Sequence, residues 1–272
     1  MMEPQKSVLV TGASSGLGAA IAERMAARGW RVFGTSRKPR PEDGPDANGI
    51  EWIAMDVCDD ASVAAGLSAI HERVDCLDGL VCNAGFGIYG SVEETSLERA
   101  RAQFETNFFG VLRVLTPVLA RMRARNAGRI LLVGSLAGRA PIPFQAHYSA
   151  TKAAIESVAF ALANEVAPYD LHVSLIEPGD INTNFNDVMD WGDVAPDSPY
   201  AERMATSEKT IRESFPKSPG PEVVADAVEQ ALTARKPKLR YPVGREALLV
   251  GLGKRFLSDR LSLKTIRDHY GV

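Results

Sequence analysis

The sequence predicts an α/β fold: an open, doubly wound sheet of about seven parallel strands with helices on both faces. Short apolar segments alternate along the chain with longer segments of helical periodicity. Several of the short segments are hydrophobic at nearly every position, as expected of strands that are covered on both faces. Alternation of this kind indicates repeated right-handed βαβ crossovers. The 272 residues, 45% of them hydrophobic, are enough to bury a large core.

The expected elements follow one another along the chain. Strands are predicted at residues 7–10, 31–35, 50–55, 79–82, 129–134 and 171–176, and helices at 16–28, 61–73, 97–123, 149–167 and 222–234. Residues 179–221 are rich in Asp, Asn, Ser and Pro and predict a long loop, which in a compact domain is usually functional or disordered. The tail 236–272 carries one more apolar stretch at 247–252, which fits a seventh strand, a docking element or an amphipathic surface helix.

Composition excludes several classes of protein. The formal net charge of −3 provides no domain-wide basic field, so we expect no nucleic-acid partner. The three cysteines, Cys58, Cys76 and Cys82, lack CxxC or His-rich spacing, which argues against a disulfide framework and a metal site. Residues 1–6 are polar and unlike a signal peptide, and no apolar run is long enough for a membrane span. We therefore expect a cytoplasmic protein.

A glycine-rich turn follows the first strand and leads into a helix. This layout directs backbone N–H groups and a helix N-terminus at a pyrophosphate. Gly12 would allow a tight exit from the strand, Gly16 a close approach of backbone to phosphate, and Gly18 tight packing of the helix on the sheet. The spacing is GxxxGxG rather than GxGxxG, so an ordinary βα turn is the alternative. The candidate dinucleotide contacts here are Thr11, Gly12, Ser14, Ser15, Gly16, Leu17 and Gly18.

The end of the second strand predicts which dinucleotide binds. An NAD-selective site places a carboxylate there for the ribose 2′-hydroxyl, but this chain has Thr35-Ser36-Arg37-Lys38 and no acid before Glu42. Arg37 can offer a charge-assisted fork to a 2′-phosphate, and Ser36 a hydroxyl. We therefore predict NADP(H) rather than NAD(H) as the cofactor, with a solvated basic turn as the alternative.

Two further strand ends supply candidate cofactor contacts. Asp56 and Val57 follow the third strand, where a carboxylate can accept a hydrogen bond from the adenine amino group, although a turn or helix-capping aspartate has the same sequence. Asn83, Ala84 and Gly85 follow the fourth strand, and their small side chains let the chain pass close to a ribose.

Tyr148 and Lys152 are four residues apart, so on a helix they leave the same face. A phenol has a pKa near ~10, and a neighbouring ammonium together with an oxidised nicotinamide favours its ionised form. Ser135 follows the fifth strand, where its hydroxyl can meet a substrate oxygen beside the cofactor. Tyr148 would then donate a proton in ketone reduction and accept one in alcohol oxidation.

These fragments together resemble the short-chain dehydrogenase/reductase family, over residues 7 to about 185. The residues that carry the resemblance are Thr11-Gly12, Gly16, Gly18, Asp56, Asn83-Ala84-Gly85, Asn107, Ser135, Tyr148-Ser149-Ala150-Thr151-Lys152 and Pro178-Gly179. The resemblance implies a Rossmann-type fold with Tyr148 as catalytic acid/base, Ser135 polarising the carbonyl, and Lys152 binding the nicotinamide ribose. It also implies that Asn107 holds a water that links Lys152 to solvent.

The resemblance extends to the segment after the sixth strand. It implies that Pro178, Gly179, Ile181 and Thr183 contact the nicotinamide carboxamide or the phosphates. Asp180 and Asn182 make this segment more polar than in many relatives, and Cys82 stands where many relatives have Asn. A homodimer or homotetramer through the long helices that begin near residues 97 and 149 is also implied.

Segments 83–87 and 240–244 look like the hydroxysteroid- and retinol-dehydrogenase-like branch. This resemblance implies a lipophilic carbonyl or alcohol substrate, steroid-, retinoid- or polyketide-like. The candidate substrate contacts are Ser135, Tyr148, Phe144 and Phe185, within walls formed by segments 136–144 and 185–215.

We thus expect residues 1–272 to form a single NAD(P)-binding Rossmann domain with a substrate-binding loop around 180–220 and a C-terminal tail at 236–272. The expected activity is that of an NADP(H)-dependent ketoreductase or alcohol dehydrogenase. A catalytically silent NADP(H)-sensing or scaffolding protein of the same fold is the alternative, and the tail looks too short for a nucleotide-sugar epimerase.

Overall fold

Seven strands form one sheet with the order β3-β2-β1-β4-β5-β6-β7, and all neighbouring strands run parallel. The computed structural model describes residues 5–38, 44–185, 189–192, 194–195, 197–244, 250 and 257–272. The strands are β1 (Ser7–Val10), β2 (Arg31–Ser36), β3 (Ile50–Ala54), β4 (Gly79–Cys82), β5 (Gly128–Val133), β6 (Leu171–Pro178) and β7 (Arg240–Val243). The doubly wound α/β fold predicted from the sequence is confirmed.

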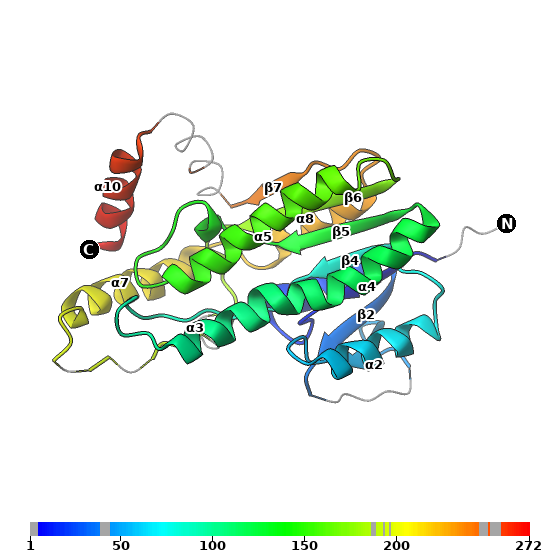
Figure 1. Cartoon of the computed structure of the whole chain (residues 1–272), viewed down its shortest axis with the longest axis horizontal. Coiled ribbons are helices and arrows are strands. Elements are labelled where there is room, and N and C mark those ends of the chain that lie inside the picture. The colour runs from blue at the N-terminus through cyan, green and yellow to red at the C-terminus, as the bar shows by residue number, and fades with distance from the viewer. Residues whose placement is uncertain are drawn as a thin grey trace.

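Helices cover both faces of the sheet (Figure 1). Because successive strand residues point to opposite faces, Leu9 packs with one hydrophobic cluster and Val8 and Val10 with the other. The first cluster lies beneath α2 (Asp60–His71), α4 (Gly110–Arg125) and α5 (Ala146–Glu165). The second lies beneath α1 (Gly16–Ala27) and α8 (Glu222–Thr233), which also pack against each other. Burial on both faces explains why the strands read as continuous apolar runs.

The single helix predicted at 97–123 is interrupted. The structure has α3 (Leu97–Phe104), a π-helical turn at Glu105–Phe109 and then α4. At the end of this turn the Gly110 N–H donates to the Glu105 carbonyl, five residues back. Single π-turns inside α-helices often mark functional sites. Asn107, only 1% exposed, lies within it.

The region predicted as a long loop contains a helix, α7 (Ala201–Ser214). Its buried residues Met204, Ser207 and Ile211 recur at helical spacing, but polar neighbours conceal this apolar face in the sequence. The tail supplies both β7, which pairs with β6, and α10 (Asp259–Tyr270), whose first turn is capped by Ser258. Of the apolar stretch 247–252, only residue 250 is among the described residues.

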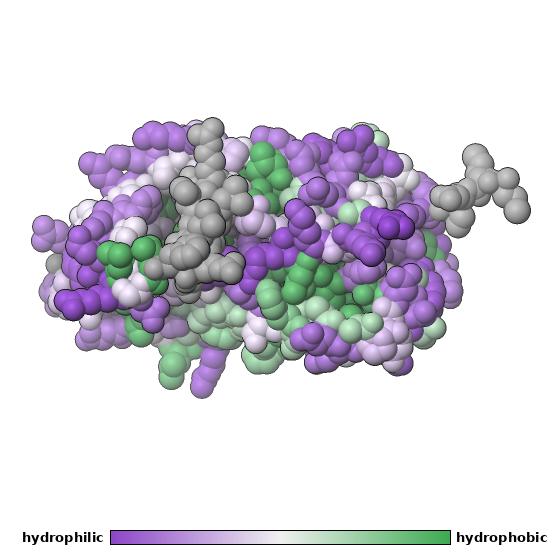
Figure 2. All heavy atoms as spheres, turned by 90° about the horizontal axis from the view of Figure 1, so that it is seen from above, coloured by the Kyte–Doolittle hydropathy of each residue, from purple (hydrophilic) through white to green (hydrophobic). Residues whose placement is uncertain are grey.

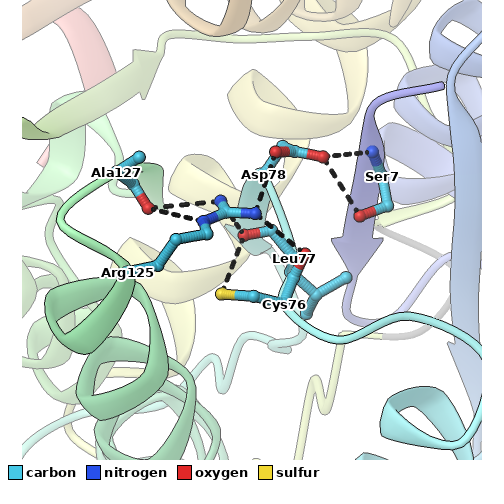
Figure 3. A network of polar contacts seen from close by, with 6 residues as sticks. All are labelled: Ser7, Cys76, Leu77, Asp78, Arg125 and Ala127. Atoms are coloured by element: carbon cyan, nitrogen blue, oxygen red, sulfur yellow. Dashed lines mark hydrogen bonds and ion pairs between the residues drawn. The ribbon is translucent and has the colours of Figure 1, made fainter. Parts of the chain in front are cut away.

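Arg125, at the end of α4, binds the segments at the amino-terminal ends of the strands (Figure 3). Its guanidinium donates to the carbonyls of Cys76, Leu77 and Ala127 at 2.8–3.4 Å and pairs with Asp78 at 3.1 Å. The Asp78 carboxylate in turn accepts from the Ser7 backbone N–H at 2.8 Å. Because this edge lies opposite the carboxyl ends of the strands, the network anchors β1 and β4 away from the end where ligands bind such sheets.

The surface seen from above is mostly hydrophilic, but hydrophobic residues gather near the middle of this face (Figure 2). Within the described ranges, no helix combines the length and the apolar character that crossing a bilayer requires.

Candidate active site

A cavity of about 500 Å³ opens at the carboxyl ends of the strands. The structure brings most of the sequence-predicted site residues to its wall. They are Gly12, Ser14, Ser15, Gly16, Leu17, Ser36, Arg37, Asp56, Val57, Asn83, Ala84, Gly85, Ser135, Tyr148, Lys152, Pro178, Gly179, Ile181, Thr183 and Phe185. Thr11, Gly18, Asn107 and Phe144 are not among the residues that line it.

The glycine-rich turn is built for close approach. Gly12 has φ +65°, a conformation that side chains other than glycine's rarely adopt. A Cβ on Gly18 would lie 2.2 Å from the Gly12 carbonyl oxygen, so α1 can pack against the turn only with glycine there. Thr11 acts from behind the wall, since its hydroxyl accepts hydrogen bonds from the N–H groups of Asn83 and Ala84 at 2.9 and 3.0 Å. These contacts fit a cradle for a dinucleotide pyrophosphate.

Asn83 helps to fix the same turn. Its side-chain amide donates to the carbonyls of Thr11 at 2.9 Å and Gly12 at 3.3 Å. The end of β4 is thereby joined to the end of β1. We therefore assign the Asn83 side chain a structural role in shaping the cradle, alongside its position in the cavity wall.

The other end of the cavity is polar and partly basic. Arg37 is exposed and, among the described residues, forms no ion pair with an acid. The Ser36 hydroxyl accepts from the Lys38 N–H at 3.3 Å. The Asp56 carboxylate accepts a hydrogen bond from the Cys58 N–H at 3.0 Å and so stabilises the turn after β3. Asp56 also lines the cavity. This end fits the adenosine half of a dinucleotide.

Ser135 and Tyr148 meet in the cavity. Ser135 follows β5 and caps a short 3₁₀ turn at Leu136–Gly138, where its Oγ accepts from the Ala137 N–H at 3.1 Å. Burial raises the pKa of the half-buried Tyr148 phenol, a hydrogen bond from Ser135 partly opposes that rise, and the charge of Asp180 adds to it. The pKa reduction expected from Lys152 is therefore not produced by the described chain alone. The chain alone therefore favours the neutral form of this phenol.

Lys152 lies one turn further along α5 and is 7% exposed. Its ammonium donates to the Val133 carbonyl at 2.8 Å and lies 5.7 Å from the centre of the Tyr148 ring. Burial lowers the pKa of Lys152 to about 8, because the charged form loses solvation. The ammonium is thus near enough to act on the phenol, but it is held in an environment that disfavours its charge.

Asn107 acts through the loop after β4. Its amide nitrogen donates to the Phe86 carbonyl at 2.8 Å and to the Thr151 hydroxyl at 3.3 Å, and its oxygen accepts from the Phe86 N–H at 3.0 Å. The side chain therefore connects α5 to residues 83–86 of the cavity wall. Gln103, fully buried on α3, supports the same loop by accepting from the Ile88 N–H at 3.0 Å. Sequence reasoning missed Gln103, because a buried glutamine carries no pattern of its own.

The two predicted substrate contacts separate. The Phe185 ring lies 5.8 Å from the Tyr148 ring and lines the cavity. Phe144 instead packs against Tyr89 and Tyr200, with ring centres 5.9 and 6.4 Å away, and does not line the cavity, although both phenylalanines pack against the same hydrophobic cluster. Its φ of +61° turns the chain away at this point.

The substrate side of the cavity is completed by further residues. Ile142, Met189, Ile211, Ser214 and Phe215 come from the two segments expected to form its walls, and Asp180 from the polar segment after the sixth strand. Gln145 and Tyr270 were not singled out from the sequence. Tyr270 comes from α10, 122 residues beyond Tyr148 in the chain. Its approach depends on the packing of α10 against α7, which local sequence patterns do not report.

Comparisons with known proteins agree with this geometry. Residues 6–191 match the family model described as short chain dehydrogenase. The chain is 34% identical to the 3-ketodihydrosphingosine reductase of Bacteroides thetaiotaomicron, over all of both proteins. It is 33% identical to human 17-beta-hydroxysteroid dehydrogenase type 1, over 86% of this chain and 76% of the relative.

A crystal structure of a short-chain dehydrogenase from Streptomyces avermitilis superposes with a TM-score of 0.83 at 33% identity, covering 99% of this chain and 97% of that one. The relatives are thus mixed in substrate and do not single out the hydroxysteroid branch. Their shared chemistry, the fold and the matched residues agree: this chain belongs to the short-chain dehydrogenase/reductase family and is an oxidoreductase that acts on alcohol and carbonyl groups.

Proposed function

We propose that this protein is an NADP(H)-dependent reductase of lipophilic ketones or aldehydes. The observation that carries the proposal is the meeting of Ser135, Tyr148 and Lys152 in one cavity whose other end is the glycine-rich cradle. A protein that only sensed NADP(H) would need the cradle but not this second group of side chains.

The chemistry assigns one task to each side chain. NADPH, bound along the cradle, would supply the hydride that reduces the carbonyl carbon. Ser135 and Tyr148 would hold the carbonyl oxygen, and Tyr148 would transfer its phenolic proton to that oxygen to give the alcohol. The phenolate that remains lies near the Lys152 ammonium, which stabilises it until a proton returns from solvent.

The protonation state of Tyr148 in the protein without dinucleotide is the one that reduction requires. A raised phenol pKa keeps the proton on Tyr148 at neutral pH, and this is the form that reduction uses. Alcohol oxidation needs the deprotonated form, which the positive charge of a bound oxidised nicotinamide would favour. The same side chains can therefore serve both directions, and reduction is proposed because Arg37 supports NADP(H) as the cofactor.

Preference for NADP(H) is supported by Arg37. It is exposed at the cavity rim, next to the Ser36 hydroxyl, where a 2′-phosphate would meet a guanidinium rather than a carboxylate. Arg37→Ala should raise the KM for NADPH by about tenfold or more, the loss expected for a charge-assisted contact. The KM for NADH should change little. Equal kcat/KM values for NADPH and NADH in the unmodified protein would refute the preference.

A lipophilic substrate is supported by the wall that faces Tyr148. Ile142, Phe185, Met189, Ile211 and Phe215 give this part of the cavity an apolar surface. Both the 3-ketodihydrosphingosine reductase and the hydroxysteroid dehydrogenase are named for lipophilic substrates. We extend that property, but neither named substrate, to this chain.

Self-association through α4 and α5 remains a proposal. Phe109, just before α4, is 48% exposed and Phe160 on α5 is 37% exposed, which is consistent with a covered apolar face in a homodimer or homotetramer. Phe160→Asp should shift the protein towards monomer in sedimentation or light-scattering measurements. An unchanged mass would count against this face.

Tyr148→Phe tests the proposed activity. With NADPH and a panel of long-chain ketones, the variant should lose about 10²- to 10⁴-fold in kcat, the usual contribution of general acid catalysis. NADPH binding, followed by its fluorescence, should persist. Tyr169→Phe is the matched control, because Tyr169 is 37% exposed and does not line the cavity. Binding of NADPH without turnover of any carbonyl or alcohol would instead support a sensing or scaffolding protein.

A further inference from the structure

An acidic side chain lies on the substrate side of the cavity, beside the proposed proton donor. Asp180 follows β6, and Ser135 follows β5. These strands are adjacent and joined beyond their ladder by a hydrogen bond from the Gly134 N–H to the Ile176 carbonyl at 2.8 Å. Val133 pairs with Ile176, so Ser135 is level with Pro178 and Asp180 lies two residues further along, and both residues line the cavity. The charge of Asp180 accordingly acts on the Tyr148 phenol.

The other charged residues that line the described cavity lie elsewhere or have other tasks. Arg37 and Asp56 follow β2 and β3, at the far edge of the sheet from β6. Lys152 is bound to the Val133 carbonyl beneath Tyr148. Among the described lining residues, Asp180 is therefore the one acid on the side where a substrate would bind.

The surroundings hold this carboxylate in place. The Ser214 hydroxyl, at the end of α7, donates to the Asp180 carboxylate at 3.3 Å. Apolar side chains of Phe185, Ile211 and Phe215 line the same region of the cavity, and the charge of Asp180 also acts on the phenol of Tyr270 from α10. Next to an apolar wall, the attraction between this carboxylate and a ligand cation is screened less than in open water.

We propose that Asp180 determines substrate specificity by binding a protonated amine that lies close to the carbonyl of the substrate. This inference rests on the proposed reductase function and narrows its substrate class to lipophilic amino ketones. With the carbonyl oxygen at Ser135 and Tyr148, a neighbouring ammonium group reaches the side of the cavity formed after β6. The alkyl chain then lies along the apolar wall. A ketone without the amine cannot form this charge-assisted contact and should therefore bind less tightly.

The test compares three substrates that differ only at nitrogen. They are 3-ketodihydrosphingosine, whose primary amine is on the carbon next to the ketone, its N-acetyl derivative, and the same keto alcohol without the amino group. All are presented in one detergent with saturating NADPH. The unmodified protein should show a kcat/KM for the free amine about ten- to a hundredfold above that for the other two, as expected for one charged hydrogen bond.

Asp180→Asn should bring this ratio close to one. The asparagine oxygen can still accept the hydrogen bond from Ser214, so the loop keeps its support while the charge is lost. Asp226→Asn is the matched control: Asp226 is an exposed acid on α8, paired with Arg24, and the ratio should stay as in the unmodified protein. NADPH binding and thermal unfolding are measured for both variants to show that each is folded.

The outcomes separate the two proposals. If the unmodified protein reduces all three substrates with similar kcat/KM, the role of Asp180 is overturned while the reductase function stands. The same holds if Asp180→Asn keeps the full preference for the amine. If no ketone in the set or in the wider panel is reduced, the proposed function itself is overturned.

Discussion

Replacing Lys152 with methionine tests whether the active-site ammonium is held at the expense of stability. Burial lowers the pKa of Lys152 from 10.5 to about 8, which corresponds to about 3 kcal/mol against the charged form in the folded protein. Because the folded pKa lies below the unfolded pKa, the unfolded chain binds more protons between these two values. The free energy of unfolding should therefore rise with pH across this window, and the full penalty should be present below pH 8.

Lys152→Met lacks this titration. It also loses the hydrogen bond to the Val133 carbonyl. Because a neutral amine can still donate this hydrogen bond, its loss changes stability by nearly the same amount at every pH. We therefore compare the pH dependence of the two proteins rather than their stabilities at one pH. From about pH 7.5 to 9.5, the free energy of unfolding of the unmodified protein should increase by about 2 kcal/mol more than that of the variant.

Urea unfolding without dinucleotide, at a series of pH values, measures this difference. Lys209→Met is the control, because the Lys209 side chain is 75% exposed, and its pH dependence should follow that of the unmodified protein. Parallel pH dependences for Lys152→Met and the unmodified protein would refute the conclusion that a buried charge at position 152 costs stability.

Three further outcomes follow from the geometry. Gly18→Ala should weaken NADPH binding and lower the melting temperature, because the added Cβ would lie 2.2 Å from the Gly12 carbonyl oxygen; unchanged fluorescence titration and thermal unfolding would contradict this. Without dinucleotide, the Tyr148 phenol should titrate above the ordinary phenol value of ~10, because burial raises its pKa; an ultraviolet difference titration against Tyr148→Phe that placed it below this value would contradict this. Asn107→Ala should lower the free energy of unfolding by about 1–3 kcal/mol in urea and reduce kcat, because the Phe86 N–H loses its partner and the Phe86 carbonyl keeps only Gln103; a variant as stable as the unmodified protein would show that the Asn107 amide does not hold the loop.

The sequence predicts the parts of the fold that depend on local periodicity. Six strands can be predicted because a strand buried on both faces is apolar at nearly every position. The glycine-rich turn can be predicted because the chain leaves β1 through a positive φ at Gly12, a conformation that favours glycine. The π-helical turn cannot be predicted in this way. The residues around Asn107 continue the helical periodicity of α3 and α4, and the one additional residue in the turn does not change the amino-acid composition.

Other features escape because they depend on contacts between distant segments. The exposed-looking helix end at Arg125 binds carbonyls of the segment before β4, and Tyr270 reaches the cavity only after α10 has packed on α7. The sequence predicts that Phe144 lines the substrate pocket beside Tyr148, but its backbone has a positive φ and its ring packs against Tyr89. In each case the side chain has several possible partners in the sequence, and only the tertiary structure selects one.

Lys152 and Asp180 bear opposite charges near the same phenol, and under the proposed mechanism this arrangement would link substrate recognition to proton transfer. The Lys152 ammonium would stabilise the phenolate that Tyr148 becomes, whereas the Asp180 carboxylate would oppose its formation. A substrate ammonium bound to Asp180 would cancel that opposition at the moment when the proton leaves. We therefore expect the amino group to raise kcat and not only to lower KM, with single-turnover measurements on the free amine and its N-acetyl derivative as the test. Equal single-turnover rates at saturation would limit Asp180 to binding, because a charge that acts on the phenol must alter the chemical step.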